Sequence, residues 1–109
     1  GLDGSGVTAW TQYPEFGLEY EIKAMRVPAN DRSDYQDVVD MVNAEVMKAK
    51  AEERDVYVLG ESMGAGIALS ATCQADSTLS PDGLVLISPA TGWDRTWLGR
   101  SRKWLVDLP

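Results

Sequence analysis

The 109-residue sequence contains no histidine and a single cysteine, Cys73. Histidine is the usual general base for a serine nucleophile, so these residues alone cannot complete a Ser-His-Asp triad. Zinc sites draw on clusters of histidine and cysteine, so we expect neither a metal nor another cofactor. Cys73 has no partner for an internal disulfide, and its helical surroundings predict a small buried hydrophobic residue.

Positive charge and long apolar runs are also scarce. Ten basic against 17 acidic side chains give a net charge of -7, which argues against nucleic-acid binding because phosphates are neutralised by clustered Lys and Arg. No apolar run approaches the roughly 18 residues needed to span a bilayer. Residues 1–15 lack the pattern of a signal peptide, so any targeting segment is expected outside this chain.

What is present is an alternation of strand and helix patterns. Apolar and charged side chains alternate over 18–27, which predicts a half-buried strand ended by Pro28. Ser33 and Gln36 form a capping-box pattern in front of a helix predicted over 34–53. The apolar face of this helix comprises Val38, Val39, Val42, Val46 and Ala49.

Two further strands and a helix are predicted after residue 55. Short apolar runs at 56–59 and 84–87 are typical of buried strands, and a helix is predicted over 63–75 between them. Strand, helix, strand, helix, strand indicates the α/β class. We therefore predict a parallel sheet with helices on both faces.

A GxSxG pattern, Gly60 to Gly64, lies between the strand at 56–59 and the following helix. In that context the serine occupies a sharp turn with its hydroxyl exposed above the sheet, so Ser62 is predicted to be a nucleophile. The second glycine is predicted to permit close approach of helix and strand. The alternative is an ordinary turn in which Ser62 merely caps the helix.

Acyl transfer also needs N–H donors where negative charge develops on the carbonyl oxygen. The Met63 amide at the start of the helix is the first candidate. Leu2 is the second, because the glycine-rich loop over residues 1–6 resembles the loop that supplies a donor beside such a serine. A flexible turn and a phosphate-cradling loop are the alternatives for this loop, although it lacks the Lys-Ser/Thr ending of a P-loop.

After residue 92 the sequence becomes rich in tryptophan and basic residues. Residues 1–92 are predicted to form the N-terminal part of the hydrolase core, and 93–109 to begin an amphipathic cap or lid segment. A helix packed on the core, a lid over an acyl pocket and an interfacial membrane contact all fit this pattern.

Four segments follow one another in an order seen in a known family: GLDGSG, RVPANDRSDYQDVVDMV, VYVLGESMGAGIAL and LVLISPAT. They resemble the glycine-rich loop, PxNDR turn, serine elbow and NPAT turn of the phytyl ester synthases, which are plastid acyltransferases of the esterase/lipase/thioesterase type. The resemblance implies an α/β-hydrolase fold, Ser62 as nucleophile, a plastid location, and transfer of fatty acyl groups to phytol or diacylglycerol.

The resemblance also places the acidic and histidine members of the triad downstream of this chain. We therefore expect a fragment of a longer protein, inactive by itself. The expected partners are a lipid acyl donor, a long-chain alcohol, a peripheral membrane surface and a larger plastid membrane assembly. Expected substrate contacts are Asp3, Glu61, Trp93 and Trp97. An esterase or lipase that uses water, and a non-catalytic scaffold subunit, are the alternative functions.

Overall fold

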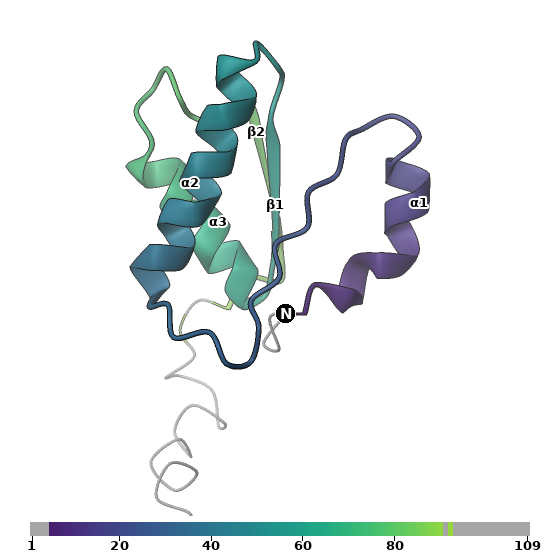
Figure 1. Cartoon of the computed structure of the whole chain (residues 1–109), viewed down its shortest axis with the longest axis vertical. Coiled ribbons are helices and arrows are strands. Elements are labelled where there is room, and N and C mark those ends of the chain that lie inside the picture. The colour runs from purple at the N-terminus through teal and green to yellow at the C-terminus, as the bar shows by residue number, and fades with distance from the viewer. Residues whose placement is uncertain (1–4, 91, 93–109) are drawn as a thin grey trace, which may run out of the picture.

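The computed structural model describes residues 5–90 and 92 (Figure 1). The elements are, in chain order, the 3-10 helix η1 (Val7–Gln12), α1 (Tyr13–Phe16), α2 (Tyr35–Ala51), β1 (Tyr57–Glu61), α3 (Met63–Gln74) and β2 (Gly83–Ile87). The strands pair in parallel, with Tyr57 opposite Gly83 and Glu61 opposite Ile87. The α/β class and the parallel sheet are thus confirmed, and the helices and strands predicted from residue 34 onward lie close to their expected bounds.

Helix α2 begins at a capping box one residue later than predicted. The Asp34 carboxylate accepts the Asp37 N–H (2.9 Å), and the Asp37 carboxylate accepts the Asp34 N–H (2.9 Å). Ser33 instead donates its N–H to Asp31 Oδ1 (2.7 Å) in the preceding turn. The predicted pair of Ser33 and Gln36 is therefore wrong, because Asp34 has the extended backbone that an N-cap residue requires.

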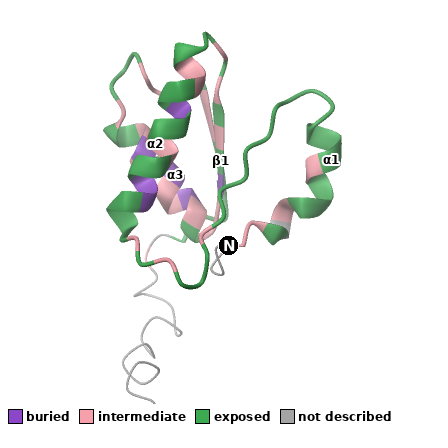
Figure 2. Cartoon of the chain, viewed as in Figure 1, coloured by how far each residue is buried: buried purple, intermediate pink, exposed green. Residues whose placement is uncertain are grey.

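The core lies where α2 packs on α3 and α3 packs on both strands (Figure 2). Val39 of α2 is fully buried. Small side chains on the facing helix let the two backbones approach closely. The remaining buried apolar residues are Val38, Val46, Ala65, Ala68 and Ala71.

The sheet face that points away from α3 carries large exposed apolar side chains. Strand alternation and the register place Tyr57 and Leu59 of β1 on this face beside Val85 and Ile87 of β2. Their exposed fractions are 62%, 52%, 45% and 43%. Helices on both faces of the sheet were predicted, whereas in the described residues only α3 packs on the strands, and α2 packs on α3.

A hydrogen-bonded carboxylate fixes the start of the sheet. Asp82 donates its N–H to the Val56 carbonyl (2.7 Å) and accepts the Val56 N–H on Oδ2 (2.7 Å). Its other carboxylate oxygen accepts a hydrogen bond from Lys50 Nζ (2.6 Å). The bonds from Lys50 and from the Val56 amide hold the pKa of Asp82 below its ordinary value.

The strand predicted over 18–27 is wrong. The chain turns at 17–20 and runs without regular structure over 21–28. A strand needs a partner to complete its hydrogen-bond ladder, and among the described residues this segment makes ion pairs instead. Lys23 Nζ lies 2.9 Å from Glu45 Oε2 on α2, and Glu21 pairs with Arg54, which lowers the pKa of the Glu21 carboxyl.

Cys73 is exposed, so its predicted burial is wrong. The buried stripe of α3 is formed by Ala65, Ala68 and Ala71. Cys73 lies two residues beyond Ala71, which at 3.6 residues per turn places it on the opposite side of the helix. Within the described ranges, no helix is both long and apolar enough to cross a membrane.

Candidate active site

Ser62 is the single residue between the end of β1 and the start of α3, at the carboxyl end of the parallel strands. Its backbone has φ 56° and ψ -118°, a conformation that residues with a side chain rarely adopt. Ser62 occupies the N-cap position, yet its side chain makes no capping hydrogen bond. The geometry therefore argues against the ordinary capping serine and is that of a strained strand-to-helix elbow.

Gly60 lets the elbow close tightly. A Cβ on this residue would lie 2.6 Å from the Ala65 Cα and closer still to the Gly64 carbonyl oxygen. A Cβ on Gly64 would meet no described atom within 4 Å apart from its chain neighbours and the backbone of its own helix. The second glycine, Gly64, was predicted to permit the close approach, whereas the structure assigns it to Gly60, whose side-chain position faces α3.

Both backbone groups of Ser62 are hydrogen-bonded. The Ser62 N–H donates to the Ile87 carbonyl at the end of β2 (3.0 Å). The Ser62 carbonyl accepts the N–H of Ala65 from α3 (3.1 Å) and the N–H of Ala90 from the turn after β2 (3.1 Å). The elbow is thus held by α3 and by β2 together. Reasoning from the sequence missed Ala90, although Pro89 beside it signalled that the regular ladder stops there.

The arrangement could support attack by a hydroxyl on a carbonyl carbon. Within the described residues the Ser62 hydroxyl has no hydrogen-bond partner, and no group there accepts the N–H of Met63. Met63 is the first residue of α3, where the helix dipole and the unpaired amides favour negative charge. The Ser62 hydroxyl and the Met63 N–H are therefore adjacent, and the sequence contains no histidine, the usual general base for a serine nucleophile.

The structure brings three of the predicted site residues together and leaves four undescribed. Glu61, Ser62 and Met63 are consecutive at the end of β1, and Glu61 is half-buried. Of the glycine-rich loop, the described part includes Gly6, whose carbonyl accepts a hydrogen bond from the Tyr13 hydroxyl (2.9 Å). Predicted residues that lie outside the described ranges are Leu2, Asp3, Trp93 and Trp97.

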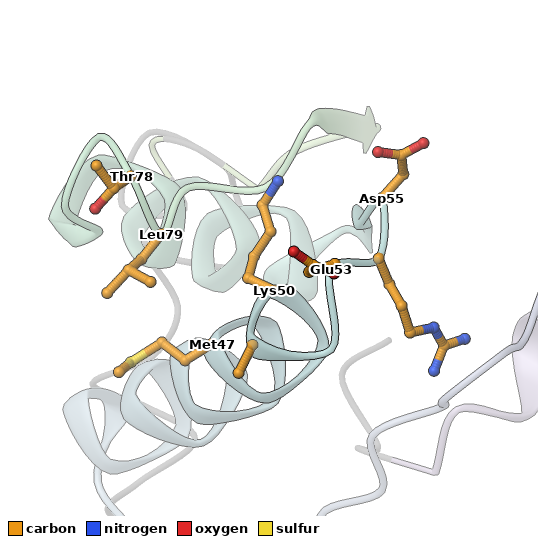
Figure 3. Close-up of a pocket in the computed structure, with 8 residues that line it drawn as sticks. Met47, Lys50, Glu53, Asp55, Thr78 and Leu79 are labelled. Carbon is orange, nitrogen blue, oxygen red and sulfur yellow. The ribbon is translucent and has the colours of Figure 1, made fainter.

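An open hollow of about 520 Å³ lies at the other end of the sheet, between the end of α2 and the loops at 53–55 and 78–79 (Figure 3). Its cationic groups are already paired, since Lys50 contacts Asp82 and Arg54 contacts Glu21 and Glu52. In the part of the chain that is described, no group of acidic, histidine or cysteine side chains could hold a metal ion. The elbow thus remains the candidate site.

Replacing Ser62 tests whether its backbone is strained. Positive-φ strain of this kind costs about 1–3 kcal/mol, and glycine relieves it at an entropic cost of about 0.5–1 kcal/mol. In urea denaturation of the complete natural polypeptide, the free energy of unfolding should therefore be about 1 kcal/mol higher for Ser62→Gly than for Ser62→Ala. Because both variants lack the hydroxyl, the comparison isolates the backbone. Equal stability of the two would contradict a strained elbow.

Two comparisons with known proteins found a match. The family model described as serine aminopeptidase, S33, matches residues 23–108. Phytyl ester synthase 2, chloroplastic, from Arabidopsis thaliana is 30% identical over 94 residues, which cover 84% of this chain and 13% of the relative. The chain therefore spans roughly an eighth of the length of that relative. No solved structure matches the chain.

Proposed function

Because this chain belongs to the serine aminopeptidase S33 family of α/β hydrolases, we propose that it carries the nucleophile of a serine acyl-transfer enzyme. The observation that carries the proposal is the conformation of Ser62, which lies at positive φ between a parallel strand and a helix without capping that helix. A serine that only caps a helix gains nothing from this strain. A strained backbone that exposes a hydroxyl above the sheet is expected of a nucleophile.

The proposed reaction has two half-reactions. Ser62 Oγ attacks the carbonyl carbon of an ester or thioester as its proton passes to a general base outside these residues. The Met63 N–H, with Leu2 as the second donor, stabilises the oxyanion that forms. The donor's alcohol or thiol leaves with a proton, and an acyl group remains on Ser62. An acceptor hydroxyl then attacks this ester as its proton passes to the same base, the bond from the carbonyl carbon to Ser62 Oγ breaks, and the proton returns to Ser62 Oγ.

The proposed acceptor is a long-chain alcohol, phytol or diacylglycerol, and the donor is a fatty acyl lipid. The named relative, a chloroplastic phytyl ester synthase, supports this choice and a plastid location. We assign substrate contacts to Glu61, Asp3, Trp93 and Trp97. We further propose that the enzyme contacts a membrane surface peripherally, within a larger plastid assembly, because substrates of this kind reside in the bilayer.

Hydrolysis is the second candidate, because the matching family is described as an aminopeptidase family. The first half-reaction would be the same, and water would replace the alcohol in the second. Product analysis distinguishes the two. Incubation of the complete natural polypeptide with an acyl lipid and phytol should yield phytyl ester in excess of free fatty acid, whereas a hydrolase would yield mainly fatty acid.

Labelling with a fluorophosphonate probe tests the nucleophile directly. We expect the complete natural polypeptide to be labelled, and Ser62→Ala to lose the label entirely, because the probe reacts with an activated serine hydroxyl. Peptide mapping should place the adduct on the Met63-containing elbow peptide. Ser77→Ala is the matched control, since it removes another exposed hydroxyl from the loop after α3, away from the elbow. If wild-type protein takes up no label at Ser62, the scaffold alternative gains and the proposal fails.

A further inference from the structure

We propose that the turn Ser88–Ala90 is a positioning element that aims the oxyanion donor, acting through a hydrogen bond from the Ala90 N–H to the Ser62 carbonyl. The proposal rests on the proposed acyl-transfer function and deepens it by assigning a role to a residue that touches no substrate. Four observations carry it, namely the interrupted ladder, the bulge at Ser88, the bond from Ala90 and the geometry of one peptide group.

Pro89 interrupts the parallel ladder at the position whose N–H would otherwise bond the Ser62 carbonyl. The pairs run from Tyr57 and Gly83 to Glu61 and Ile87, so that the next pair would be Ser62 and Ser88. In a regular parallel ladder the Ser62 N–H would donate to the carbonyl of Ile87, and its carbonyl would accept the N–H of residue 89. The first bond is present (3.0 Å). The second cannot form, because residue 89 is proline and has no N–H.

A bulge supplies the missing donor from the following residue. Ser88 has φ 44°, a left-handed conformation that is uncommon for a residue with a side chain. This extra residue bends the chain, as β-bulges do, and brings the Ala90 N–H to 3.1 Å from the Ser62 carbonyl oxygen. Ser62 and Ser88, which directly follow the two paired strands, thus both have positive φ.

The Ser62 carbonyl belongs to the same peptide group as the Met63 N–H. No peptide bond among the described residues is cis, so this C=O and N–H point in opposite directions across a rigid plane. A donor that fixes the direction of the carbonyl also fixes the direction of the Met63 N–H. The Ala65 N–H bonds the same carbonyl from α3, so that Ala90 and Ala65 hold the plane from two elements.

This geometry predicts how the reaction responds when the Ala90 N–H is removed. An oxyanion donor contributes about 100- to 1000-fold to the rate when it is aimed correctly, and loosening its peptide plane should forfeit part of that factor. We expect the maximal rate of fluorophosphonate inactivation, kinact, to fall about tenfold to hundredfold. The probe's KI should stay within about twofold, because the binding groups are untouched.

Three variants of the complete natural polypeptide test the proposal. Ala90→Pro removes the N–H, and incorporation of lactic acid in place of Ala90 removes it while keeping the methyl group and the freedom of the backbone. Ala90→Ser keeps the N–H at this exposed position, so its kinact should equal that of the wild type. Thermal unfolding of each variant establishes that it is folded before kinact and KI are compared.

The outcomes separate the two proposals. Wild-type protein and Ser62→Ala alone decide whether Ser62 is an activated nucleophile, and if it is not, the positioning role falls with it. If wild type is labelled and the folded lactic acid variant keeps kinact within twofold, the positioning role is overturned while the nucleophile stands. If neither N–H-deficient variant folds, the bond from Ala90 serves stability and the positioning role is likewise overturned.

Discussion

Gly60→Ala is expected to destabilise the protein by about 1–3 kcal/mol, the usual cost of forcing an added carbon into a packed site. The added Cβ would lie 2.6 Å from the Ala65 Cα and nearer to the Gly64 carbonyl oxygen, so the contacts are with backbone that cannot rotate away. Helix α3 has to move off the strand to make room. Since α3 carries the elbow, fluorophosphonate labelling of Ser62 should fall at least about tenfold as well, given the sensitivity of such reactions to misplacement.

Urea denaturation of the complete natural polypeptide measures the first effect, and the rate of labelling measures the second. Gly64→Ala is the matched stability control, because it adds the same methyl group where no described atom outside its own helix and chain neighbours lies within 4 Å. In the first turn of a helix this change should be neutral or stabilising by up to about 1 kcal/mol. Equal stability of the two alanine variants would show that the approach of α3 to β1 is not limited by Gly60.

Val39→Ala is expected to lower the free energy of unfolding by about 2–3 kcal/mol. Val39 is fully buried where α2 packs on α3, and the substitution removes two methyl groups that neighbouring residues cannot replace. Each buried methylene is worth about 0.8 kcal/mol, and the cavity left behind adds to the loss. Helix α2 contacts α3, and α3 begins at the elbow. A weaker contact between these helices should therefore also make the position of the elbow less fixed.

The same denaturation experiment should show a change within about 0.5 kcal/mol for Met41→Ala, because Met41 lies on the same helix with 45% of its surface exposed. A loss for Val39→Ala no larger than the loss for Met41→Ala would mean that the contact between α2 and α3 contributes little to the stability of the protein.

Much of the fold from residue 34 onward followed from sequence periodicity. Apolar residues at helical spacing predicted α2, and short apolar runs bounded by turns predicted β1 and β2, because burial imposes these patterns on any sequence. The capping box was missed by one residue, since Ser33 and Asp34 both suit an N-cap and the choice depends on the turn at Asp31. The strand predicted over 18–27 was wrong for another reason. Alternation of apolar and charged residues concerns a single segment, whereas a strand forms only when a second strand pairs with it.

The site was predictable only as far as its local motif extends. The GxSxG pattern between a strand and a helix predicted the elbow at Ser62, and the backbone geometry supports it. The bond from Ala90 was not predicted, because it joins segments 28 residues apart and depends on the register of two strands. Pro89 marks in the sequence the position at which the regular ladder ends, but not which amide replaces the missing donor.

The hydrogen bonds at the two ends of β2 help to set the register between β1 and β2. Leu84, Val85, Leu86 and Ile87 are all apolar, so a slip by one residue would still place aliphatic side chains on both faces of the sheet. Asp82 at one end and Ala90 at the other distinguish the alignments, because a slipped strand would forfeit the bonds to Val56 and Ser62 together. The polar contacts at the two ends of β2, more than the apolar side chains between them, thus select the one alignment in which the Ser62 carbonyl accepts the Ala90 N–H.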